Sequence, residues 1–242
     1  MDMTDNNAFS RLEQEYKNYT DYCTYAVKEV STKLDNLKSE MKSQIKMAHS
    51  DDSYYNLIDS YHSRIKSFDS AFEKLVRRKM PPNMESIKDF HDIAGVRVIT
   101  PFKDDVYKVA EMLSFHRSIT VVETKDYIED TKENGYKSLH LITNVNYSLG
   151  NIEHNIPTEI QIRSKAMDML WSLDHIINYK KAEVNPKNIE LFQRIAKILD
   201  EFEDAAMELR DTAGVKAATE FMKGAEVIVT GAKKVIETNQ QD

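Results

Sequence analysis

The absence of helix-breaking residues from the first 80 positions constrains the fold more than any other feature of this chain. No proline precedes Pro81 and no glycine precedes Gly95, and a long stretch of this kind favours helix. Apolar residues recur there at gaps of three and four, which places them on one helical face. They are Leu12, Tyr16, Tyr19, Cys23, Ala26, Val30, Leu34, Leu37, Met41 and Ile45. The pattern predicts one long helix, or two helices in line.

A second helix is expected from about Tyr54 to Lys79, after a polar break at residues 49–53 that offers N-cap side chains. Its buried stripe would consist of Ile65, Phe68, Phe72, Leu75 and Val76. Its flanks carry more positive charge than solubility requires, from Arg64, Lys66, Lys74, Arg77 and Arg78. The Pro81-Pro82 pair ends this helix, because proline cannot donate a backbone hydrogen bond.

Beyond the prolines, short apolar strands alternate with helices. Strands are predicted at 93–100, 119–124, 137–147 and 156–163, with helices at 104–116, 167–180 and from Pro186 onward. A weaker helix is expected over 212–234, where three glycines interrupt the pattern. The order favours an α+β, or mixed α/β, fold, with a mixed sheet of about five strands flanked by helices and long helical extensions at both ends.

The charge and cysteine content restrict the class of protein. The net charge of −7 does not favour nucleic acid, so an anionic ligand must be held by a local cluster of cations. Cys23 is the only cysteine, which excludes an intramolecular disulfide and is typical of the reducing cytosol. The polar, acidic start is no signal peptide, and no apolar run approaches the roughly 20 residues that span a bilayer. We therefore expect a cytoplasmic protein without a membrane partner.

The segment from Pro157 to Arg163 is predicted to be the central strand. Ile160 and Ile162 alternate with polar residues, so one face of the strand is apolar while the other carries an acid, an amide and a guanidinium. A polar face of a lone strand would usually meet solvent. Two nearby segments with similar polar residues, 92–97 and 135–140, suggest instead that a polar site spans several strands.

These three segments, Asp92-Ile-Ala-Gly-Val-Arg97, Gly135-Tyr-Lys-Ser-Leu-His140 and the 157–163 strand, resemble the catalytic core of the RelA/SpoT family. The likeness is greatest to its short members, the small alarmone synthetases, and runs from about Tyr61 to Lys181. It implies a nucleotidyltransferase-like synthetase fold in one domain, with an N-terminal helical region (1–52), a catalytic core (53–182) and C-terminal helices (183–242). It also implies transfer of the β,γ-pyrophosphate of ATP to the 3′-hydroxyl of GDP or GTP, with GMP a further acceptor to consider.

The resemblance assigns the chemistry to two carboxylates. Asp92 and Glu159 match the family's acidic pair, and both are expected to bind Mg²⁺, with Glu159 also able to accept the proton of the attacking hydroxyl. The expected ATP-binding residues are Arg64, Lys66, Lys74, Arg77, Arg78 and Arg97. The expected acceptor-binding residues are Lys132, Asn134, Tyr136, Lys137, His140, Gln161 and Asp168. Tyr136 would stack on guanine.

Two departures from the family pattern keep other functions open. The helix after the last strand reads Met167-Asp-Met-Leu-Trp171-Ser-Leu-Asp174-His175, with the tryptophan moved by one position, about 100° around the helix, and a glutamate replaced by Asp174. The acceptor could thus be an adenosine nucleotide or a tRNA 3′ end. A non-catalytic oligomeric scaffold or RNA-binding module is the alternative from another class.

The same resemblance predicts synthesis without hydrolysis, because the hydrolase domain of larger relatives has no counterpart here. The apolar stripes of the terminal helices suggest packing between subunits, and the family suggests a homotetramer. An alarmone or single-stranded RNA is a candidate regulator. Motifs of other enzyme classes are absent from the sequence, including the phosphate-binding loop, the dinucleotide fingerprint and zinc-ligand clusters.

Overall fold

The computed structural model describes residues 3–47, 53–131, 135–178 and 186–219 of the chain. The elements follow in the order α1 (Met3–Met47), β1 (Tyr54–Tyr55), β2 (Ser60–Ile65), α2 (Phe68–Arg78), α3 (Met84–Lys88), β3 (Ala94–Thr100), α4 (Asp105–Ser114), β4 (Ile119–Asp126), β5 (Leu139–Leu149), β6 (Ile152–Ser164), α5 (Lys165–Asn178), α6 (Pro186–Thr212) and β7 (Lys216–Ala217).

A five-stranded sheet in the order β2-β3-β6-β5-β4 forms the centre of the molecule. Strands β3 and β6 pair in parallel, while the other neighbours are antiparallel. The predicted mixed sheet of about five strands is therefore confirmed. The strand that contains Pro157–Arg163 lies at its centre, as the sequence predicted, because β6 has a paired neighbour on each side.

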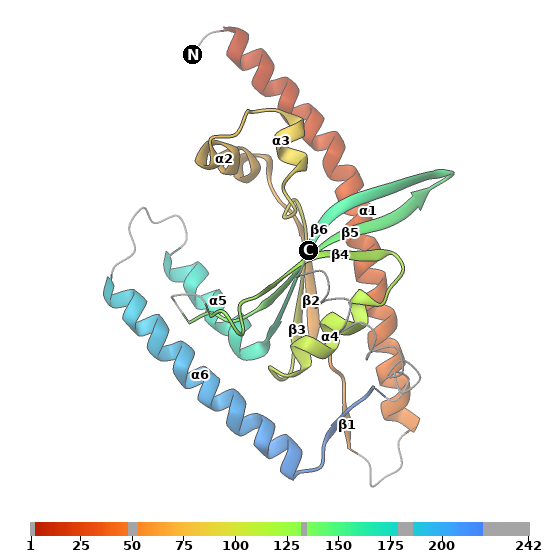
Figure 1. Ribbon diagram of the computed structural model, residues 1–242, viewed down its shortest axis with the longest axis vertical. Coiled ribbons are helices and arrows are strands. Elements are labelled where there is room, and N and C mark those ends of the chain that lie inside the picture. Colours follow the sequence, from red (N-terminus) through yellow and green to blue (C-terminus); the bar gives the residue numbers. More distant parts are fainter. Residues whose placement is uncertain (1–2, 48–52, 132–134, 179–185, 220–242) are drawn as a thin grey trace, which may run out of the picture.

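The predicted long N-terminal helix is confirmed as α1, and its apolar stripe is buried from Leu12 to Met41. Helices α1 and α4 contact one face of the sheet, whereas α5 lies against the other face with α6 beside it (Figure 1). The side chains between α1 and the sheet form the main core, which includes Val96, Ile160 and Leu141. Across the helices that the structure describes, none is both long and apolar enough to cross a bilayer.

The predicted helix over 54–79 is wrong in its first half. Residues 60–65 form the edge strand β2, which pairs with β3, and the helix α2 begins only at Phe68. The Ser67 side chain caps α2 by accepting a hydrogen bond from the Ser70 amide. Tertiary pairing overrides the helical spacing here, because Tyr61 and Ile65 pack on the core while His62 and Arg64 project from the other face.

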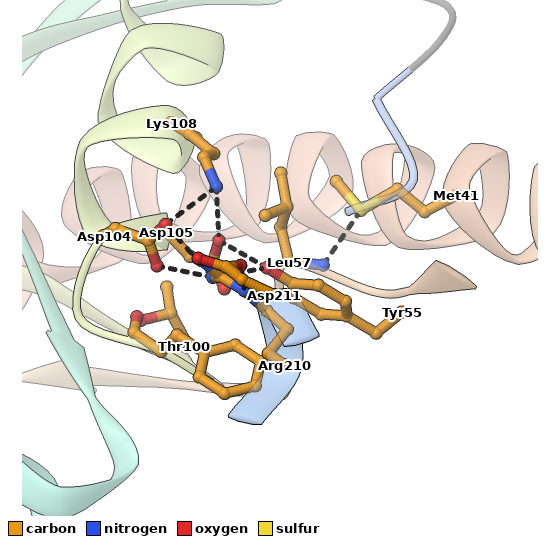
Figure 2. Close-up of polar contacts among 10 residues, drawn as sticks. Met41, Tyr55, Leu57, Thr100, Asp104, Asp105, Lys108, Arg210 and Asp211 are labelled. Carbon is orange, nitrogen blue, oxygen red and sulfur yellow. Dashed lines mark hydrogen bonds and ion pairs between the residues drawn. The ribbon is translucent and has the colours of Figure 1, made fainter. Parts of the chain in front are cut away.

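The predicted helix over 212–234 is also wrong where the structure describes it, since α6 ends at Thr212 and β7 follows. Residues 220–234 of that prediction lie outside the described residues. Strand β7 pairs in parallel with β1, which joins segments about 160 residues apart in sequence. At the end of α6, Arg210 donates to both carboxylate oxygens of Asp104, at 2.8 and 3.0 Å, and to the Tyr55 hydroxyl at 3.2 Å (Figure 2). These contacts fix the C-terminal end of α6 to the body.

Candidate active site

One face of the sheet collects polar side chains from four neighbouring strands. The register pairs Arg64 with Gly95 and Gly95 with Glu159, and it places both Arg97 and His140 opposite Gln161. Paired residues project from the same face of a sheet, so these side chains share the face that α5 only partly covers. The polar alternation seen in the sequence thus continues across the strands.

Asp92 lies just before β3 and is held by two lysines. Its carboxylate oxygens lie 2.8 Å from Lys66 Nζ and 2.6 Å from Lys74 Nζ. Burial alone would raise the pKa of Asp92, but the two ammonium groups lower it to about 2. Lys74 also lies 4.4 Å from the centre of the Phe90 ring. The result is a fixed anion between two cations at the edge of the polar face.

Glu159 is the second acid of this face, and both of its oxygens have partners. Its Oε1 lies 3.0 Å from His140 Nδ1, and its Oε2 accepts a 2.8 Å hydrogen bond from the Gln161 amide. Burial alone would raise the pKa of Glu159. Its contacts with His140 and Gln161 outweigh burial and lower the pKa, while the charge of Asp92 raises it by a smaller amount. Asp92 therefore lies near enough to act on Glu159.

Two arginines stack on Trp171 of α5. The guanidinium carbon of Arg97 lies 3.7 Å from the centre of a Trp171 ring, and that of Arg163 lies 4.7 Å from it. Asp168 faces the same two arginines, at 2.9 Å from Arg163 and 4.0 Å from Arg97. Burial and the neighbouring Arg163 lower the pKa of Arg97 to about 10, which leaves it protonated at neutral pH.

Tyr136 is fixed by Arg163, a contact that the sequence did not predict. Arg163 is 1% exposed and donates a 2.5 Å hydrogen bond to the Tyr136 hydroxyl. The tyrosine itself is largely buried against α5 and α6. It borders a pocket of ≈ 220 Å³ between the sheet and these helices, which is lined by Tyr136, His140, Gln161, Leu170, Trp171, Asp174 and Phe192.

The other predicted residues lie as follows. Arg64 is exposed, with its aliphatic part close to Gly95, and Arg77 and Arg78 are exposed on α2. Lys137 does not line the pocket, because its ammonium nitrogen pairs with Asp200 of α6 at 2.8 Å. Lys132 and Asn134 lie outside the described residues.

The predicted site residues therefore gather around two centres on one face. Of the donor candidates, Lys66 and Lys74 hold Asp92, whereas Arg97 lies on Trp171. The acceptor candidates His140 and Gln161 contact Glu159 and line the pocket. Sequence reasoning missed Arg163, Phe192 and the role of Trp171. Arg163 carried a signal, since it belongs to the polar alternation of the central strand, whereas Phe192 lies on a distant helix with no local signal.

The two acids of the site could hold Mg²⁺ together with the phosphates of a bound nucleotide, but not by protein ligands alone. Within the described ranges, no group of three or more metal-ligating side chains converges. Asp92 and Glu159 supply hard carboxylate oxygens, and Mg²⁺ is commonly held by one or two carboxylates together with substrate phosphates. Each acid would have to give up a contact to bind the ion. Asp92 would lose one of its two lysines, and Glu159 would lose a hydrogen bond to His140 or Gln161.

The chain matches a known protein family. Residues 63–184 match the family described as "Region found in RelA / SpoT proteins". This range covers half of the chain and includes Asp92, Tyr136, His140 and Glu159.

Two curated proteins of Bacillus subtilis (strain 168) are similar in sequence. GTP pyrophosphokinase YwaC is 43% identical over 152 residues, which cover 61% of this chain and 72% of the relative. GTP pyrophosphokinase YjbM is 33% identical over 188 residues, which cover 76% of this chain and 83% of the relative.

Two solved protein structures from the same bacterium share the fold of this chain. Small alarmone synthetase 2 aligns with a TM-score of 0.71 and 32% identity, over 82% of this chain and 99% of that one. Small alarmone synthetase 1, solved with its product pppGpp, aligns with a TM-score of 0.71 and 29% identity, over 82% of this chain and 98% of that one.

Proposed function

This chain belongs to the RelA/SpoT family, and on that basis we propose that it is a small alarmone synthetase. The proposed reaction moves the β,γ-pyrophosphoryl group of ATP to the 3′-hydroxyl of GDP or GTP. The new bond joins the 3′-oxygen to the β-phosphorus, the bond between the α- and β-phosphates of ATP breaks, and AMP leaves. The relatives named as GTP pyrophosphokinases and the neighbour solved with pppGpp support this choice.

The observation that carries the proposal is the placement of Asp92, just before β3, near enough to Glu159 of the paired strand β6 for its charge to act on the pKa of Glu159. Transfers of phosphoryl type depend mainly on positioning and on neutralisation of charge. The face provides a fixed acid near a second acid, with cations on either side. A pocket lined by His140 and Gln161, the two partners of Glu159, lies beside this second acid.

On the donor side, cations around Asp92 would bind the phosphates of ATP. Lys66 and Lys74 are already held at Asp92, so their side chains lose little further freedom when phosphate binds. Arg97 is held flat by Trp171, and a guanidinium fixed in this way suits bidentate contact with phosphate oxygens. We expect exposed Arg64 to stack on adenine, with Arg77 and Arg78 near the outer phosphates.

On the acceptor side, Glu159 would take the proton of the 3′-hydroxyl. Its carboxylate is ionised at neutral pH, because its pKa is below the ordinary value. His140 and Gln161 fix its orientation. Guanine would bind in the adjacent pocket against Tyr136, where Trp171 and Phe192 supply further apolar surface.

Magnesium is the cofactor that this reaction class requires, and Asp92 and Glu159 are the residues that would hold it. The ion would neutralise charge on the transferred phosphates. One of the two lysines at Asp92 would then turn from the acid toward the nucleotide. We expect synthesis of the product without its hydrolysis, as the sequence resemblance implies.

A homotetramer is the proposed assembly, supported by an apolar stripe on the outer face of α6. Its members are Leu191, Ile198, Phe202 and Leu209, all at least 46% exposed and spaced by four or seven residues. Phe192 and Leu199, about 100° around the helix from this stripe, pack inward. Light scattering that returned the mass of a single 28.0 kDa chain would contradict assembly.

The acceptor is best identified by offering several at once. Purified protein with ATP and Mg²⁺ would be incubated with an equimolar mixture of GTP, GDP, GMP and the adenosine nucleotides, and the products separated by mass spectrometry. We expect guanosine nucleotides that gain one pyrophosphate, with AMP formed in equal amount. Pyrophosphorylated adenosine products alone would instead support the other acceptor, and no product from any acceptor would contradict the proposal.

A further inference from the structure

A pair of lysines lies beside the acceptor pocket and is occupied by an acid of α6. Lys103 Nζ lies 3.2 Å and Lys137 Nζ 2.8 Å from the same oxygen, Oδ1 of Asp200. Lys103 also lies 2.5 Å from Asp204. The two ammonium groups come from different parts of the chain, one after β3 and one before β5, and they converge on a single anionic atom.

We propose that Lys103 and Lys137 form a binding site for the 5′-phosphates of the acceptor nucleotide, and that Asp200 occupies this site until a phosphate replaces it. The proposal rests on the proposed function and deepens it, because it assigns the residues that would distinguish GTP and GDP from guanosine. Asp200 would thereby set the affinity for acceptors according to their phosphate charge.

The position of the lysines suits this role. Lys137 follows Tyr136 directly, so the site continues from the wall of the pocket that would hold the base. Phe192 lines that pocket, and Asp200 lies eight residues further along α6, about 12 Å along the helix axis. A nucleotide with its base in the pocket would extend its phosphates along α6 toward the lysines.

Charge favours a phosphate over the carboxylate at this position. A phosphate carries close to two negative charges and three acceptor oxygens, whereas Asp200 offers one oxygen to both lysines. Charge-assisted hydrogen bonds to two ammonium groups are among the stronger polar contacts in proteins. Neither lysine is fully buried, with side chains 25% and 23% exposed, so solvent and ligand can reach them.

A third acid of α6 lies near the two lysines. Glu203, one turn beyond Asp200, is 4% exposed, and burial raises its pKa, against the opposite effect of its hydrogen bond with Ser164 and of the charges of Lys103 and Lys137. Three acids of α6 therefore lie near two lysines, an excess that favours exchange of one acid for a ligand.

The helix itself need not leave for this exchange. Arg210 holds the C-terminal end of α6 to Asp104 and Tyr55, as Figure 2 shows, and Phe192 packs its N-terminal half on α5. Rotation of the Asp200 side chain alone would release Lys137 and remove one of the two acids at Lys103, which keeps its contact with Asp204. A substitution of Asp200 should therefore test the site without removing α6.

The test compares Asp200→Asn with Glu201→Gln, an equal charge change at an exposed neighbour on the same helix. Titration calorimetry of the full chain would measure binding of GDP, guanosine and inorganic pyrophosphate. We expect Asp200→Asn to bind GDP and pyrophosphate about fivefold more tightly, the order expected for loss of one competing ion pair. Its affinity for guanosine should not change. Lys103→Gln should weaken the binding of GDP and of pyrophosphate by a similar factor.

The proposal would be overturned if Asp200→Asn and Glu201→Gln changed the affinity for pyrophosphate equally. It would also be overturned if Asp200→Asn raised the affinities for guanosine and GDP by the same factor. Lys103 is not part of α6, so its variant decides the question if Asp200→Asn unfolds. Product formation is recorded separately: a protein that makes no pyrophosphorylated nucleotide refutes the proposed function, while the pyrophosphate titrations still decide the phosphate site.

Discussion

Replacing Asp92 with asparagine should destabilise the protein by an amount that the structure predicts. Burial would raise the pKa of this carboxyl, yet Lys66 and Lys74 lower it from 3.8 to about 2. Each tenfold change in a proton dissociation constant corresponds to about 1.4 kcal/mol, so the lowering corresponds to about 2 kcal/mol of stabilisation. The side chain is 21% exposed, which limits screening by solvent.

The sign of the pH dependence follows from the lowered pKa. A carboxyl whose pKa is lower in the folded state stabilises the protein above its unfolded pKa of about 4, and the stabilisation is lost as pH falls toward 2. The wild type should therefore exceed Asp92→Asn in free energy of unfolding by about 2 kcal/mol from pH 5 to 7. The gap should narrow as the pH falls below 4.

Urea unfolding followed by circular dichroism, at matched protein concentration and at several pH values, measures this gap. Asp89→Asn is the matched control, because Asp89 is exposed and lies three residues away. A variant of Asp92 as stable as the control at pH 7 would refute the inference that the two lysines are neutralised by this acid. A gap that stayed constant down to pH 3 would refute the assignment of the lowered pKa.

Three further predictions concern the pocket and the cofactor. Gly135→Ala should destabilise the protein more than Gly150→Ala. Both glycines have positive φ, at 80° and 60°, so both variants carry backbone strain. Only at Gly135 would the new Cβ also lie 2.5 Å from the Cβ of Ala196, whereas Gly150 has open space. Thermal unfolding of the two variants isolates the contact with α6. Tyr136→Phe should cost about 1–3 kcal/mol in urea unfolding, since buried Arg163 loses its hydroxyl partner. Chelation of divalent cations should stop product formation, and Mg²⁺ should restore it; activity that persists in excess chelator would exclude the proposed cofactor.

The sequence predicted those parts of the fold whose signals are local. The apolar stripe of α1 and the alternation of the central strand follow from burial of one face, and both are confirmed. Residues 60–65 have helical spacing of the same kind, yet they form β2, because the free edge of β3 offers backbone pairing that a local pattern cannot show. The segment after Thr212 also pairs with a distant strand, β1.

The candidate site was predictable to a similar degree. The motif residues Asp92, His140 and Glu159 gather on one face because each lies on or beside one of three adjacent strands. Arg163 was missed as a site residue, although it belongs to the polar alternation of the central strand, because its partner, Tyr136, lies 27 residues away. The ion pairs between α6 and the lysines were missed for the same reason.

The most direct test of the account is a comparison of Glu159→Gln with Glu153→Gln, an exposed position on the same strand. Single-turnover formation of the 3′-pyrophosphorylated guanosine nucleotide would be followed with ATP, GDP and Mg²⁺, and GDP affinity measured in parallel by calorimetry. Glu159→Gln should lose at least about a hundredfold in rate, as expected for removal of a general base, with GDP affinity retained and Glu153→Gln unchanged. A Glu159→Gln enzyme that forms product at the wild-type rate would contradict the assignment of Glu159 to proton transfer and metal binding on this face.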